Sequence, residues 1–156
     1  LSLHDLHHVL TGYDTTIVGE AELGGFELAS GCGRHWVSWV LQHEAFTVGL
    51  LLAPRRTCRA FLRGRRSRNL YDRREADEAL FQRPVREVER EMGLDVTQPT
   101  RTSDRVALGL WAASAALHLL FNLVAYPLLL APLALALHLA WRLDAPRAAA
   151  PAPARS

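Results

Sequence analysis

The longest uncharged segment of the chain runs from Val106 to Trp141 and contains no Asp, Glu, Lys or Arg. One helical crossing of a bilayer needs only about 20 apolar residues. Pro127 and Pro132 lie near the middle of the segment, and arginines precede and follow it. Because basic residues favour the cytoplasmic side, we expect both ends there. The sequence therefore predicts a hydrophobic helical hairpin at 106–142, crossing or re-entering a bacterial cytoplasmic membrane from its cytoplasmic face.

The rest of the chain is rich in Leu, Ala, Arg and Glu, which favours an all-α fold. Capping and glycine signals divide 1–96 into a small multi-helix domain, and the polar segment 97–105 is predicted to be a linker. Trp36–Leu52 is apolar on nearly all sides, so we expect a largely buried third helix. Thr57–Tyr71 is predicted to be an Arg-rich fourth helix. The Ala/Pro-rich tail, 143–156, is expected to be disordered.

All eighteen basic residues are Arg, and nine of them lie between Arg55 and Arg74, although the formal net charge is only +2. Such a cluster can attract anionic lipid or nucleic acid, or it can be a solvated helix face. Aromatic residues are sparse in it, so we expect no nucleic-acid partner. The functional alternative that we prefer is contact with phospholipid head groups through three arginines of one helix: Arg59, Arg63 and Arg66.

Two histidines near the start of the chain, His4 and His8, are four residues apart among leucines that recur at helical spacing. Residues with this spacing stack one turn above the other on an α-helix, so both imidazoles can bind one metal ion. Asp5 lies close enough in angle to join them. Ser2 and Asp5 also form a capping-box pattern, so Asp5 could instead serve only as a cap. Because the chain begins at Leu1 and a capped helix follows at once, we expect a piece of a longer protein.

A further ligand is available on the next predicted helix, at about Ile17–Ala29. Glu20 lies near its start, and Gly24 and Glu27 share its face. We expect the absence of a side chain at Gly24 to leave space for a substrate or water beside the ion. Imidazole and carboxylate together suit Zn²⁺, and also Fe²⁺ or Mn²⁺. The alternative is that these residues are exposed polar groups, with Glu20 favoured by the helix dipole. The predicted metal ligands are His4, Asp5, His8 and Glu20.

A second pair of chemically active residues, His43 and Glu44, interrupts the apolar third helix. These residues could be extra metal ligands or a buried hydrogen-bonded pair. We favour the pair, because a polar group within an apolar helix needs a partner.

The spacing of the predicted metal ligands resembles a family signature. The chain has His4-Asp5-Leu6-His7-His8, then eleven residues, then Glu20. This pattern resembles the H-D-x-x-H-x11-E signature of the coenzyme Q biosynthesis protein 4 family, which acts in ubiquinone biosynthesis. AFLRGRRSRNLYD and LFQRPVREVEREMGLD are similar to later segments of that family, in the same order. The resemblance covers Leu1 to Asp95. The family's N-terminal helices and the hydrophobic segment are the two departures.

This resemblance implies that His4, Asp5, His8 and Glu20 are the metal ligands of a membrane-associated protein that handles polyprenylated aromatic quinone precursors. The ion would act as a Lewis acid on head-group oxygens, assisting decarboxylation with hydroxylation. A non-catalytic scaffold that presents the precursor to other quinone-biosynthesis proteins is the first alternative. A membrane zinc protease with Asp5 as general base is the second. A homodimer is left open.

Overall fold

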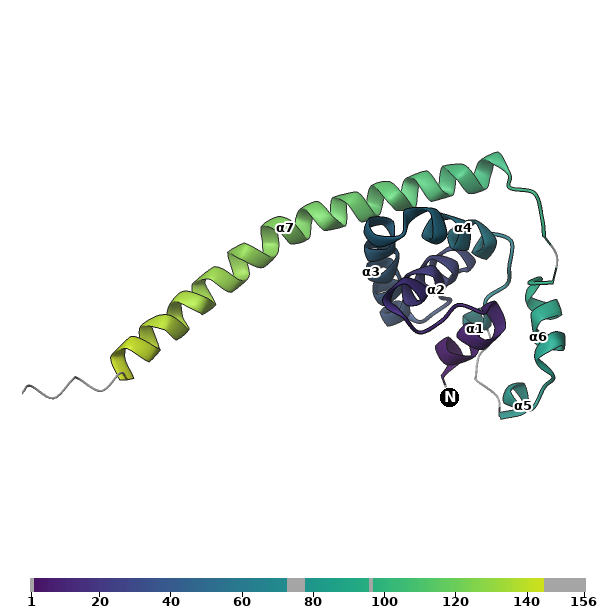
Figure 1. Cartoon of the computed structure of the whole chain (residues 1–156), viewed down its shortest axis with the longest axis horizontal. Helices are drawn as coiled ribbons and strands as arrows, with labels where there is room; N and C mark the ends of the chain where they lie inside the picture. Colours follow the sequence, from purple (N-terminus) through teal and green to yellow (C-terminus); the bar gives the residue numbers. More distant parts are fainter. Residues whose placement is uncertain (1, 73–77, 96, 145–156) are drawn as a thin grey trace, which may run out of the picture. The chain divides into compact units, whose positions relative to one another are not determined.

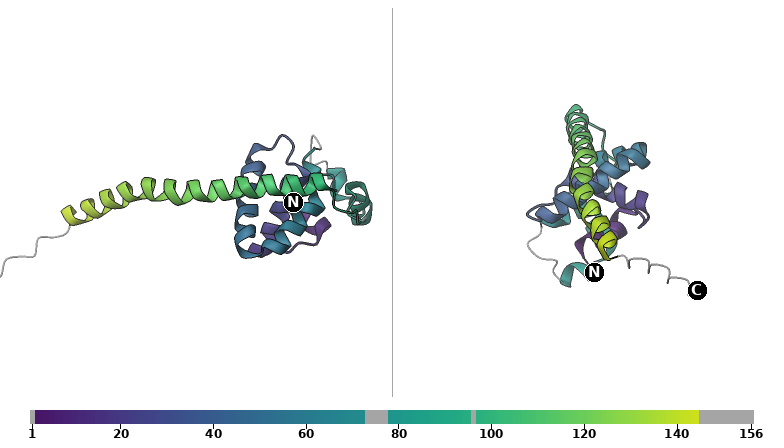
Figure 2. Two further views of the ribbon diagram at one scale, coloured as in Figure 1. Left: turned by 90° about the horizontal axis from the view of Figure 1, so that it is seen from above. Right: turned by 90° about the vertical axis from the view of Figure 1, so that its left-hand side faces the viewer.

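The computed structural model describes residues 2–72, 78–95 and 97–144. Every regular element within these ranges is helical, which confirms the all-α class. The expected disorder at 143–156 concerns mainly 145–156, which lie outside the described residues. The α-helices (Figures 1 and 2) are α1 (Leu3–Thr11), α2 (Ile17–Ser30), α3 (Trp36–Leu52), α4 (Pro54–Gly64), α5 (Glu78–Phe81), α6 (Val85–Met92) and α7 (Thr102–Asp144), with a short 3-10 helix at Leu70–Asp72.

Helix α2 lies between α3 and α4 and packs against both (Figure 1). Small residues allow this close approach. A Cβ added at Gly24 would lie 2.6 Å from the Cβ of Ala45 on α3, and one added at Gly64 on α4 would overlap the carbonyl oxygen of Phe26. Gly24 therefore brings α3 onto α2, and our expectation that it leaves space beside the metal ion is wrong.

Two groups of buried apolar side chains hold the helices together. The first group joins α1 and α6 to α2, and the second joins α2, α3, α4 and the start of α7. Burial of large apolar side chains is the main source of stability in such a domain. The first group contains Leu10, Leu23, Phe26, Leu70, Leu80, Val88 and Met92; the second contains Leu28, Ala29, Phe46, Phe61 and Ala115.

Helix α3 has the predicted bounds, but the expectation that it is largely buried is wrong. Its apolar residues do not all find neighbours, because the described residues cover it only on the sides of α2, of α4 and of the first turns of α7. Leu41 and Leu51 are 58% and 61% exposed. The fourth helix is also shorter than predicted and ends at Gly64.

The hydrophobic segment forms one continuous helix, α7, so the predicted hairpin is wrong (Figure 2). Pro127 and Pro132 lie inside this helix. A proline removes one backbone hydrogen bond, but a hairpin also needs turn residues, and the segment between the prolines is only Leu and Ala. The chain divides into two compact units, Leu1–His118 and Leu119–Ser156. Among the described residues, one helix, α7, is long and apolar enough to cross a membrane.

Candidate metal centre

The N-terminal helix α1 is fixed at both ends. At its start the hydroxyl of Ser2 accepts a hydrogen bond from the backbone N–H of Asp5, while the Asp5 carboxylate accepts one from the N–H of Ser2 at 2.8 Å. At its end Gly12 adopts a left-handed conformation, with φ of 76°, that only glycine adopts at no steric cost. These caps hold the histidines of α1 on the side that faces α2.

Three potential ligands meet between α1 and α2. The Nε2 atom of His4 lies 3.2 Å from Oε2 of Glu20, and Nε2 of His8 lies 3.1 Å from Oε1 of the same carboxylate. One ligand atom from each residue lies within 4.8 Å of the other two. Ligands at about 2.0–2.1 Å from a tetrahedral zinc ion are separated by roughly 3.3 Å. The three side chains therefore fit a zinc ion with little rearrangement.

His8 is held between Tyr13 and Glu20 by contacts of both its ring nitrogens. Its Nδ1 lies 3.0 Å from the carbonyl oxygen of Tyr13, which can only accept, so Nδ1 carries the proton. Its Nε2 is buried, forms no hydrogen bond among the described residues and lies 3.1 Å from Oε1 of Glu20. In a neutral ring with the proton on Nδ1, this contact joins two acceptors. A metal cation placed between Nε2 of His8 and the Glu20 carboxylate would be coordinated by both groups, which would otherwise repel each other.

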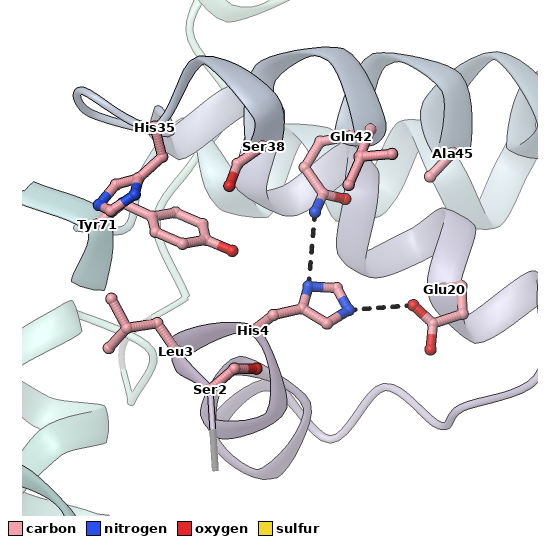
Figure 3. Close-up of a pocket in the computed structure, with 10 residues that line it drawn as sticks. Ser2, Leu3, His4, Glu20, His35, Ser38, Gln42, Ala45 and Tyr71 are labelled. Carbon is pink, nitrogen blue, oxygen red and sulfur yellow. Dashed lines mark hydrogen bonds and ion pairs between the residues drawn. The ribbon is translucent and has the colours of Figure 1, made fainter. Parts of the chain in front are cut away.

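His4 is oriented by a buried carboxylate. Its Nδ1 lies 3.3 Å from both oxygens of Glu27 on α2, which leaves Nε2 directed at Glu20 (Figure 3). A carboxylate behind a histidine ligand fixes the ring and raises its basicity, as in many zinc sites. The hydrogen bond with Glu27, although opposed by burial, raises the pKa of His4 to about 9, with Glu20 adding to the shift. A metal ion would therefore replace a proton on Nε2.

Glu27 also binds His7, which faces away from the candidate ligands. Nδ1 of His7 donates to Glu27 at 2.5 Å, and Nε2 accepts from the backbone N–H of Leu70 at 3.3 Å. Nδ1 is therefore the donor of this ring and Nε2 its acceptor. The hydroxyl of Tyr71 donates to the second oxygen of Glu27 at 3.4 Å. Burial raises the pKa of Glu27, but the hydrogen bonds from His4 and His7 outweigh it and hold the pKa below its ordinary value.

A cavity of about 610 Å³ opens beside His4 and Glu20 (Figure 3). Figure 3 shows Gln42 and Ala45 of α3 on one side of His4, with His35, Ser38 and Tyr71 across the cavity. Three protein ligands and an open side are typical of catalytic zinc sites, where water or substrate takes the fourth position. The lining residues are Ser2, Leu3, His4, Glu20, His35, Ser38, Leu41, Gln42, Ala45 and Tyr71.

The structure brings together three of the four predicted ligands. Asp5 is exposed, and its carboxylate belongs to the cap of α1, outside the group of His4, His8 and Glu20. Sequence reasoning missed the role of Glu27. Its position seven residues after Glu20 was the available signal, because it places both carboxylates on one face of α2.

The predicted pairing of His43 with Glu44 is wrong. Each side chain instead contacts the first part of α7: Nε2 of His43 lies 3.1 Å from the hydroxyl of Ser114, and Glu44 lies 2.5 Å from Nε2 of His118. Residues next to each other on a helix point about 100° apart and rarely meet. Neither residue joins the group of three candidate ligands.

Two of the three arginines predicted to contact lipid bind residues of other helices, and the third, Arg59, donates to the carbonyl of Arg55 one turn earlier on its own helix at 3.3 Å. Arg63 donates to the carbonyl of Thr11 at 2.8 Å and lies over the ring of Tyr13. Arg66 forms an ion pair with Asp104, its Nε lying 2.7 Å from the carboxylate. Arg59 is exposed. Contact of this surface with lipid stays a prediction.

Comparison of the chain with protein-family models, with curated proteins and with solved structures finds no match.

Proposed function

We propose that the protein binds a divalent metal ion, zinc by its ligand set, through His4, His8 and Glu20, and acts on the head group of a polyprenylated aromatic quinone precursor in ubiquinone biosynthesis. The observation that carries the metal site is that Nε2 of His4 and Nε2 of His8 meet one carboxylate, that of Glu20, at 3.2 and 3.1 Å. The substrate class rests on the resemblance to the coenzyme Q biosynthesis protein 4 family. A cavity beside the ligands and an apolar helix in the same chain suit a lipid-soluble substrate.

The bound ion would supply Lewis acidity toward a phenolate or carboxylate oxygen of the head group. Glu27 holds the ring of His4 in place, and Tyr13 fixes the proton of His8 on Nδ1. The aromatic rings of His35 and Tyr71, whose centroids are 5.2 Å apart, line the far side of the cavity and offer a surface for a flat ring. The reaction that we propose is loss of the head-group carboxylate as CO₂, with a proton taking its place on the ring carbon. Hydroxylation at the same carbon would instead consume one dioxygen and one water per CO₂ released, with dioxygen accepting two electrons and leaving as hydrogen peroxide.

The protease alternative needs a general base beside the ion. Asp5 was the candidate, but its carboxylate accepts from the N–H of Ser2 and lies outside the group of ligands. The geometry therefore does not support a protease with Asp5 as its general base.

The test begins with elemental analysis of purified full chain beside His8→Ala and Glu20→Ala. We expect about one zinc, iron or manganese ion per chain in the wild type and none in either variant. Glu87→Ala is the matched control, because Glu87 is an exposed carboxylate on α6. Equal metal content in all four proteins would overturn the proposal.

The second step incubates the metal-loaded chain in detergent with a prenylated hydroxybenzoate labelled at the carboxyl carbon. Release of labelled CO₂ by the wild type and not by His8→Ala supports the enzymatic proposal. Binding of the compound without turnover, with or without dioxygen, would replace it by the scaffold alternative.

A further inference from the structure

We propose that the exposed apolar face of α3 lies in the interfacial layer of a lipid bilayer, beside the opening of the metal-site cavity. Six residues make up this α3 face: Val37, Val40, Leu41, Val48, Leu51 and Leu52. Their exposed fractions range from 39% to 61%. At about 100° per residue they fall within an arc of about 120°. The inference does not depend on the proposed chemistry of the site.

The α3 face is a side of the helix that the described residues leave uncovered. The opposite sides of α3 are occupied: Ala45 and Phe46 pack toward α2 and α4, and Trp39 stacks on Trp111 of α7 with ring centroids 6.1 Å apart. Soluble monomers rarely expose an apolar surface that runs the length of a helix, and such a surface marks an interaction site. One acid, Glu44, lies within the arc, and its carboxylate binds His118.

Charge and aromatic residues at the ends of α3 favour lipid as the occupant. Arg34 is exposed just before the helix, and Arg55 is exposed just after it. Trp36, 73% exposed, sits at the first turn. Arginine side chains reach from an apolar surface to anionic head groups, and tryptophan prefers the interface. A helix with this pattern lies in the plane of the membrane.

Two further features connect this surface to a membrane. The same chain carries a helix long and apolar enough to cross one. Leu41 belongs both to the α3 face and to the lining of the cavity beside His4 and Glu20. Contact of α3 with the bilayer would therefore place the cavity opening at the lipid surface. If the proposed function holds, the apolar tail of the substrate would pass along Leu41 without entering water.

The experiment measures how deeply α3 lies in the bilayer. Binding of the chain to vesicles would not test the inference, because α7 alone could hold the chain there. Single cysteines at Val40 and Leu51 carry an environment-sensitive fluorophore in a Cys58→Ser background; Cys32, the remaining cysteine, is buried. The matched control is a label at Glu87 on α6, which is also exposed. The full chain is reconstituted into phosphatidylcholine vesicles with and without phosphatidylglycerol, containing lipids with a nitroxide at a shallow or a deep acyl position.

We expect emission at positions 40 and 51 to shift to the blue and to be quenched more by the shallow nitroxide than by the deep one, because an interfacial helix lies only about 5–10 Å below the surface. Phosphatidylglycerol should increase the quenching, and the label at 87 should show neither effect. Emission at 40 and 51 that matches the label at 87 would overturn the inference. A blue shift without lipid quenching, with energy transfer between chains, would overturn it in favour of a second copy as the occupant. Neither result depends on metal content or turnover.

Discussion

Glu27 and His7 form a buried pair in which Nδ1 of the imidazole lies 2.5 Å from the carboxylate and neither side chain is exposed. The same carboxylate lies 3.3 Å from Nδ1 of His4. Because the backbone N–H of Leu70 fixes the proton of His7 on Nδ1, Glu27 remains an acceptor for both rings. The orientation of the candidate ligand His4 therefore depends on Glu27, which is not itself one of the candidate ligands.

The first prediction concerns Glu27→Gln. The amide keeps the size of the side chain and one acceptor oxygen but loses the charge that orients His4. We expect zinc affinity to fall by about 10- to 100-fold, the usual effect of removing a carboxylate behind a histidine ligand. The zinc affinity of each protein is measured by competition against a chromophoric chelator.

Glu22→Gln is the control for this change. Glu22 lies on the same helix and is also buried, but it pairs with Arg56, outside the group of candidate ligands. Equal zinc affinity in the two variants, with unchanged circular dichroism, would remove the orienting role of Glu27.

The second prediction is a pH dependence of stability in the metal-free protein. The hydrogen bond to Glu27, opposed by burial and aided by Glu20, raises the pKa of His4 from 6.5 to about 9. A raised pKa in the folded state means that the protonated form stabilises the fold. This contribution is complete below about pH 6.5 and disappears as the pH rises through about 9.

Urea unfolding in detergent with a chelator, followed from about pH 6 to pH 10, tests this dependence. We expect the free energy of unfolding of the wild type to fall across that range by more than that of His4→Gln, which has no imidazole to titrate. Parallel curves for the two proteins would contradict the shift at His4.

The third prediction is that Asp5, unlike His4, His8 and Glu20, does not bind the metal ion. In the structure the Asp5 carboxylate caps α1, so Asp5→Ala should retain most of the bound metal while it lowers the thermal stability. Elemental analysis and thermal unfolding of the same sample measure both. Loss of metal equal to that of His8→Ala would show instead that Asp5 coordinates the ion, as the family resemblance implies.

Local signals in the sequence were sufficient to predict the first two helices and to select three residues that the structure brings together, His4, His8 and Glu20. Ser2, Gly12 and the spacing of His4 and His8 are features of neighbouring residues, so they could be interpreted without knowing the fold. Glu20 could be paired with them because the loop between the helices is short. The all-α class followed from composition for the same reason.

The errors arose where the answer depends on neighbours distant in sequence. Hydrophobicity alone predicts burial of α3, but only the fold decides that no described element covers Leu51. The role of Glu27 depends on Leu70 and Tyr71, more than forty residues away. Pro127 and Pro132 were interpreted as a turn, although an apolar helix can contain prolines without reversing.

The last prediction tests the close packing that places α2, and with it Glu20 and Glu27, between its neighbours. In Gly64→Ala the added methyl group would overlap the carbonyl oxygen of Phe26, a backbone atom that cannot move without shifting α2. We expect a loss of about 1–3 kcal/mol in the free energy of unfolding and weaker zinc binding. Gly109→Ala is the matched control, because nothing lies within 4 Å of its added methyl group and alanine favours a helix interior by up to ~1 kcal/mol. Denaturant unfolding in detergent compares them, and equal stability of the two variants would mean that α2 and α4 do not approach as closely as Gly64 and Phe26 indicate.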